Sequence, residues 1–276
     1  MHPSAIDPGS LPPGAWQRHY RFVEQPPPEA AAAFAFSPPA VGWAVELDDA
    51  AAGAGRLAVL AIPCTDPEES PWQERARSWA EGGAAGGANC STVILQHALV
   101  LTGCGRLAVL AAEDRLEALA RAAVETACHD LQLGDLEREL AGNWAEWQAD
   151  VQLTQTFNER TLARQDRFRR RFGEVTDLAL RAARLAAPIH APHVHPPTLA
   201  SQVQERLRDR RHLAHRHETL TDQLGTFQQF YEGCWHRVND HLLARSSRIL
   251  EWTIIVLLGL QILLSLYEIL GSLPAQ

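Results

Sequence analysis

Lysine is absent from the 276-residue sequence, so all 25 basic residues are arginines. The chain therefore cannot form a Schiff base, use a lysine nucleophile or bind phosphate through a P-loop lysine. Its five cysteines are odd in number and show no CxxC spacing, which argues against a disulfide framework or a zinc ribbon. The patterns GxxxxGK[ST], GxGxxG and GxSxG are also missing. These absences predict a protein that is not an enzyme and binds no cofactor, and the exclusive use of arginine is typical of a GC-rich bacterial genome.

The N-terminal part is rich in proline. Nine of the 17 prolines lie within the first 40 residues. Proline interrupts both helices and strands, and no basic start precedes the one apolar run there, so a secretory signal peptide is not indicated. We therefore predict a proline-rich disordered leader over residues 1–39.

Residues 40–132 are predicted to form a small α+β domain of two ββα-like units. Apolar runs at 41–47 and 56–62 flank one turn, and runs at 91–102 and 106–112 flank another. A helix-like stretch follows each pair. The heptapeptide Gly-Arg-Leu-Ala-Val-Leu-Ala occurs at both 55–61 and 105–111, which either records a duplication or is a coincidence in a chain rich in alanine and leucine.

A long antiparallel helical hairpin is predicted over residues 133–248. Apolar residues recur every three or four positions from Leu136 onward, as a buried helix face requires. Four prolines between 188 and 197 predict a turn there. The second arm shows nearly heptad spacing from Leu220, which is typical of a coiled coil.

The C-terminal residues 249–270 are strongly apolar and predict a single-pass transmembrane helix, followed by a short tail at 271–276. Basic residues precede the segment and none follows it, which places the N-terminal part in the cytoplasm and the protein in a bacterial inner membrane. Flanking charges and aromatic rings are expected to anchor the helix in the lipid bilayer: Arg245, Arg248, Glu251, Trp252 and Tyr267.

The residues around Trp252 resemble a known family. The segment 248–258 begins Arg-Ile-Leu-Glu-Trp and follows a long arginine-punctuated helix. It is similar to the end of the required-for-meiotic-nuclear-division family, domain of unknown function 155. The similarity covers roughly the last eighty residues, and Gln261 stands where members repeat an acidic residue. The resemblance implies a membrane-tethered protein without enzymatic activity, whose mitochondrial relatives are linked to organellar translation.

Arginines gather in two clusters on the predicted hairpin. If the two arms fold back on each other, the clusters face one patch. One interpretation is a solvated surface balanced by neighbouring carboxylates. The other is a docking face for an anionic partner, an acidic protein or RNA. The candidate partner-binding residues are Arg167, Arg169, Arg170, Arg171, Arg206, Arg208, Arg210 and Arg211.

Histidines near the predicted turn suggest a metal site, but their surroundings do not complete one. His190, His193 and His195 have short spacing, yet no cysteine or carboxylate lies nearby in sequence. We therefore predict no metal site. The overall prediction is a membrane-anchored scaffold or tether that presents its helical hairpin to a protein partner or to other copies. The alternative is an oligomeric channel with one spanning helix per subunit.

Overall fold

The structure, a computed structural model, describes residues 11–27, 33–37, 42–47, 56–82, 90–154, 165–191 and 197–271. Side chains are described for most of these residues, but in the C-terminal helix only as far as Leu263, with gaps before Ile249. The described chain forms two compact units. Unit 1 comprises Met1–Asn143 and Leu178–Leu224, and unit 2 comprises Trp144–Asp177 and Gly225–Gln276.

Unit 1 contains a mixed sheet of seven strands in its described part, in the order β2-β3-β1-β4-β7-β6-β5. Five helices are described across the chain, and α2, α4 and α6 contribute residues to both units. The strands are β1 (Trp16–Val23), β2 (Ala33–Ala35), β3 (Trp43–Leu47), β4 (Arg56–Pro63), β5 (Ser91–Leu95), β6 (Ala98–Thr102) and β7 (Arg106–Ala111). The helices are α1 (Trp72–Glu81), α2 (Glu113–Thr154), α4 (Gln165–Ile189), α5 (Leu199–Arg210) and α6 (Leu213–Gly271).

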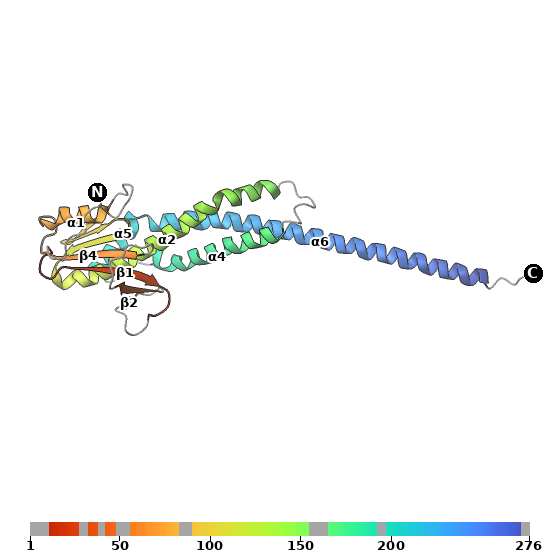
Figure 1. Ribbon diagram of the computed structural model, residues 1–276, viewed down its shortest axis with the longest axis horizontal. Helices are drawn as coiled ribbons and strands as arrows, with labels where there is room; N and C mark the ends of the chain where they lie inside the picture. The colour runs from red at the N-terminus through yellow and green to blue at the C-terminus, as the bar shows by residue number, and fades with distance from the viewer. Residues whose placement is uncertain are drawn as a thin grey trace, which may run out of the picture. The chain divides into compact units, whose positions relative to one another are not determined.

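The repeated heptapeptide forms the centre of the sheet. Its two copies supply β4 and β7, which pair in parallel with Val59 opposite Leu107. Both strands are apolar on both faces, as a parallel pair covered by helices on each side requires. On one face Leu57 and Val59 pack with α2 and α5, and on the other Leu60 packs with α1. These helices and the sheet form the core of unit 1 (Figure 1).

The prediction of two ββα units is wrong. The predicted second hairpin exists, because β6 and β7 pair antiparallel around Gly103–Gly105, but β5 adds a third strand to it. The predicted first hairpin does not form, since β1 lies between β3 and β4 and pairs with both. A strand from the N-terminal region has therefore replaced the expected partner.

Part of the predicted disordered leader is ordered. Residues 16–23 contain no proline and form β1, an inner strand of the sheet. Tyr20 is buried, and Trp16 and Phe22 pack against the same core cluster. Prolines on both sides led to the wrong prediction, although the alternation of apolar residues between them is typical of a half-buried strand. Residues 1–10, 28–32 and 38–39 of the predicted leader lie outside the described residues.

The predicted two-arm hairpin is also corrected. The expected first arm contains the end of α2 and all of α4, separated by residues 155–164, which lie outside the described residues. In unit 1 Arg181 of α4 contacts Glu139 of α2, while His217 of α6 contacts Ala182 of α4. Three helices therefore pack together in unit 1, where the prediction had two (Figure 1).

The transmembrane prediction is not supported. Among the described residues, no helix combines the length and the apolarity needed to cross a bilayer. The single-pass inner-membrane localisation and the expected anchoring roles lose their basis. Arg248, Glu251 and Trp252 are instead exposed on α6, while the side chains of Arg245 and Tyr267 lie outside the described set.

Candidate functional site

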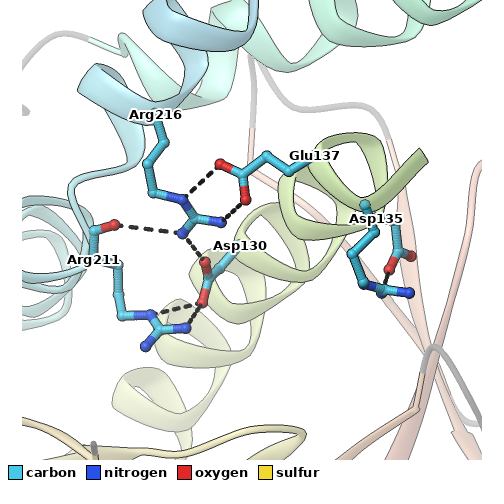
Figure 2. A network of polar contacts seen from close by, with 6 residues as sticks. Asp130, Asp135, Glu137, Arg211 and Arg216 are labelled. Carbon is cyan, nitrogen blue, oxygen red and sulfur yellow. Dashed lines mark hydrogen bonds and ion pairs between the residues drawn. The ribbon is translucent and has the colours of Figure 1, made fainter. Parts of the chain in front are cut away.

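An ion-pair network joins α2 to the junction between α5 and α6. The chain turns at His212, whose φ of 50° lies in the left-handed region. This turn ends α5 and starts α6, so Arg211 and Arg216 both reach α2. Arg216 donates two hydrogen bonds to the Glu137 carboxylate, at 2.9 and 2.7 Å. It also donates to Asp130 at 2.6 Å (Figure 2).

Arg211 completes this network. Its Nε donates to Asp130 at 2.7 Å, so Asp130 accepts from two guanidinium groups. The hydrogen bonds from Arg216 to Glu137 and Asp130 raise the pKa of Arg216 further above its usual range, against the opposing effect of burial. Two cations thus face two carboxylates, and the charges within the network are balanced. Arg211, predicted to bind a partner, is committed to Asp130 within its own chain.

Arg206, Arg208, Arg210 and Arg211 form the second arginine cluster of the sequence. Its members other than Arg211 are of two kinds. Arg208 is half-buried and donates to the carbonyl oxygen of Pro188 at 3.0 Å. Arg206 and Arg210 lie one turn apart on α5 and are exposed. Within the described part of the chain, neither forms an ion pair with a carboxylate. Arg206 and Arg210 are therefore the exposed members of this cluster in unit 1, and their role in binding a partner stays a prediction.

The first arginine cluster, Arg167 and Arg169–Arg171, belongs to unit 2 and also has paired and exposed members. Arg167 forms an ion pair of 2.7 Å with Asp150, which is fully buried. Asp150 also accepts a hydrogen bond of 3.1 Å from Tyr231, and burial together with this carboxylate raises the pKa of Tyr231. Arg171 is largely buried and pairs with Glu146 and Glu174. These residues hold unit 2 together.

Arg169 and Arg170 are the exposed members of the first cluster. Arg169 lies over the ring of Trp235, with 6.0 Å between the guanidinium carbon and the ring centroid. Arg170 approaches Glu174 at 3.8 Å, a weak surface contact. Since the two clusters belong to different units, the single combined patch stays a prediction.

Unit 1 also contains a cavity of about 580 Å³ that the sequence interpretation missed. It is lined by residues from β2 and the following segment, α2, the end of α4 and α5. Two of its side chains, Glu125 and His129, lie one turn apart on α2 and are only 6% and 5% exposed. The signal that would have found them is this polar pair at i and i+4 within an apolar helix face.

Burial changes the proton affinities of both groups. It raises the pKa of Glu125, although a hydrogen bond of 2.9 Å from the Ser37 backbone N–H to Oε1 acts in the opposite sense. Burial, with the positive charge of Arg208, lowers the pKa of His129 to about 4. The imidazole is therefore neutral at pH 7 and offers one donor and one acceptor. Among the described residues, His129 has no hydrogen-bond partner and packs edge-on to Phe36.

The remaining candidate groups are the histidines near the end of α4 and the cysteines. His190 Nε2 lies 3.3 Å from His217 Nδ1, and His217 Nε2 donates to the Ala182 carbonyl oxygen at 2.9 Å. His193 and His195 lie outside the described residues. No group of three metal-ligating side chains comes together in the described ranges. Burial raises the pKa values of Cys64, Cys90 and Cys128, so these cysteines are thiols at neutral pH.

Unit 2 carries one further feature, on α6. Every large apolar side chain from Ile249 to Leu263 is between 54% and 67% exposed.

Family models, curated proteins and solved structures were compared with the chain, and none of them matches it. The resemblance in the C-terminal segment therefore stays a prediction.

Proposed function

We propose that this protein is a scaffold without enzymatic activity, which assembles with other copies of itself through the C-terminal part of α6. The observation that carries the proposal is the run of exposed apolar side chains from Ile249 to Leu263. Fully burying one such side chain contributes about 1.5 to 3 kcal/mol. Partial burial of several therefore outweighs the cost of association.

The pattern of this run favours several partner helices around it. Apolar residues occupy all sides of the helix from Ile254 to Leu258, so one neighbour cannot cover them. Within unit 2 the earlier α6 residues Phe227, Tyr231 and Cys234 are buried by their own chain. The later segment has no such cover among the described residues, and a second copy always brings an equally apolar helix of equal length.

Charge supports a parallel arrangement of these helices. Arg248 and Glu251 are exposed and lie three residues apart at the start of the run. In parallel copies in register, Arg248 of one helix lies about 4.5 Å along the axis from Glu251 of the next, at about 1.5 Å per residue. The long side chains can bridge this separation, so these opposite charges favour the parallel arrangement.

The exposed arginines favour a second role, the binding of an acidic protein. Arg206 and Arg210 in unit 1, and Arg169 and Arg170 in unit 2, project into solvent. Arginine and tryptophan are common in binding hot spots, and Arg169 lies over Trp235, which is 43% exposed. A protein is favoured over RNA because the chain carries a net charge of −8, which opposes a phosphate backbone.

Capture between two differently tagged full-length chains tests the assembly. We expect one tag to recover the other after co-expression. Replacing Ile255, Leu258 and Ile262 by glutamine should reduce recovery at least tenfold, because these residues form one stripe of the apolar run. The control is Leu180→Gln, a substitution of an equally exposed leucine in unit 1. Undiminished recovery in the triple variant, or no recovery of the wild-type chain, contradicts the proposal.

The exposed arginines of the two units are tested separately from the assembly. The variant with glutamine at Arg169, Arg170, Arg206 and Arg210 should keep self-capture but lose any salt-sensitive protein bound by the wild-type chain. The control is Arg138→Gln, which removes an exposed arginine already paired with Asp135. Equal recovery of that protein by the quadruple variant and by Arg138→Gln overturns this role. Loss of the bound material after nuclease treatment also overturns it, because the partner would then be a nucleic acid.

A further inference from the structure

The cavity of unit 1 has the size and the lining of a small-molecule site. Its volume of about 580 Å³ falls within the range of roughly 300 to 1,000 Å³ that is usual for ligand pockets. The lining combines apolar atoms of Phe34 and several alanines with a few charged and polar groups. This composition separates it from the network of Figure 2, where each charge already has its partner.

The N-terminus of α5 opens onto this cavity. Thr198 caps the helix: its Oγ1 accepts a hydrogen bond from the Ser201 backbone N–H, and the Ser201 Oγ accepts one from the Thr198 backbone N–H. Thr198, Ala200 and Ser201 all line the cavity. A helix of 12 residues carries partial positive charge at this end, which favours an anion.

Two arginines add full positive charge to the same space. Arg208 and Arg121 both line the cavity. Arg208 uses Nη1 for the Pro188 carbonyl oxygen, and its other donors form no hydrogen bond within the described chain. Arg121 lies over the ring of Phe34 and approaches Glu117 at 3.5 Å. An oxyanion can therefore meet guanidinium donors and the α5 helix end together.

His129 is the independent sign that something polar belongs there. Its side chain is 95% buried, lines the cavity and lacks a hydrogen-bond partner in the described part of the chain. Its ring nitrogens do not belong to the buried, unpartnered side-chain atoms of the described chain, so they stay accessible from the cavity and can bond to a ligand. Glu125, one turn away, accepts a hydrogen bond of 2.9 Å from the Ser37 N–H at Oε1 and also interacts with the Ser37 side chain. Both groups can hydrogen-bond to a ligand.

We propose that this cavity binds a small organic anion. Its oxyanion group lies at the N-terminus of α5 beside Arg208 and Arg121, and its polar body hydrogen-bonds to His129 and Glu125. Glu125 and Glu205 also line the cavity, and their carboxyl groups favour a ligand of low negative charge over a polyphosphate. The ligand class is thus a compact carboxylate or phosphate monoester that carries hydroxyl or amide groups.

Nuclear magnetic resonance of the full-length chain, labelled with ¹³C in its histidine rings, tests this site. The probes are inorganic phosphate and glycolate, which separate a preference for phosphate from one for carboxylate. We expect a saturable shift of the His129 ring signals with at least one probe. Arg121→Gln should weaken that binding at least fivefold and Arg208→Gln at least tenfold. The control Arg206→Gln, on the same helix but outside the cavity, should bind as the wild type does.

Arg121→Gln distinguishes a loss of ligand binding from a loss of folding. Arg121 is exposed, and its substitution removes a surface contact with Glu117 and the contact with the Phe34 ring, whereas Arg208 also holds the end of α4. The site is refuted if neither probe gives a saturable shift up to about 50 mM, or if folded Arg121→Gln binds with unchanged affinity. This result is independent of self-capture through α6, so the two proposals can fail separately.

Discussion

Arg216 of α6 holds the carboxylate of Glu137 on α2 through two parallel hydrogen bonds of 2.9 and 2.7 Å. This pair, with Asp130, joins the start of α6 to the helix that covers the sheet. Arg216→Gln should lower the free energy of unfolding by about 2 kcal/mol, because Glu137 then loses its cation and Asp130 keeps only Arg211. Urea denaturation monitored by circular dichroism measures this change.

Arg138→Gln is the matched control for Arg216. Its partner Asp135 lies three residues away, and both side chains are exposed. Exposed pairs contribute little, so we expect a loss of less than about 0.5 kcal/mol. Equal losses in the two variants contradict a structural role for the Arg216 network.

Arg167 should stabilise unit 2, although the sequence predicted it to be an exposed partner-binding residue. Arg167→Gln leaves the fully buried carboxylate of Asp150 with only Tyr231 as a hydrogen-bond donor among the described residues. We expect a loss of about 2 to 3 kcal/mol in urea unfolding. Arg170→Gln, in the same cluster but exposed, should change the stability by less than about 0.5 kcal/mol. The reverse order would show that Arg167 is dispensable for folding.

Gly103 cannot accept a side chain. It precedes the tight turn between β6 and β7, and a Cβ there would collide with the backbone of Ala80. Gly103→Ala should therefore lower the free energy of unfolding by about 2 kcal/mol or more, which thermal unfolding shows as a lower midpoint. Gly142→Ala should raise stability by about 0.5 to 1 kcal/mol, because Gly142 lies within α2 and a Cβ there meets nothing. Similar effects of the two substitutions would refute this packing.

His129 predicts a defined pH dependence. Its pKa is about 4 in the folded chain and about 6.5 in an unfolded one, so the unfolded state takes up the proton first as the pH falls. Above about pH 6.5 the imidazole is neutral in both states, so His129 does not make the free energy of unfolding depend on pH there. Between about pH 6.5 and 4 stability should fall, by up to about 3 kcal/mol in total. His129→Gln should show a shallower fall in urea unfolding between pH 7 and 4.5, and an unchanged slope contradicts the burial of a neutral imidazole.

Local patterns predicted the central part of the fold. The two copies of Arg-Leu-Ala-Val-Leu-Ala were identified as strands from their apolar runs, and both are strands. Their parallel pairing was not predictable, since it depends on β1 lying between β3 and β4. Strand order is decided by contacts distant in sequence, which periodicity does not report.

The candidate site was predictable only in part. The arginine clusters are evident in the sequence, but which members are exposed depends on the carboxylates that each one meets. Asp130 lies 81 residues before Arg211, and Asp150 lies on a different helix from Arg167. Glu125 and His129 gave no signal beyond their spacing, because the cavity beside them is formed by α5 and β2.

The molar mass of the full-length protein tests the assembly through α6 most directly. Sedimentation equilibrium over a hundredfold range of concentration should give a discrete multiple of the 30.4 kDa chain mass. The variant with glutamine at Ile255, Leu258 and Ile262 should shift toward the single-chain mass under the same conditions. A wild-type mass of 30.4 kDa at every concentration would contradict the proposal that α6 joins copies of this chain.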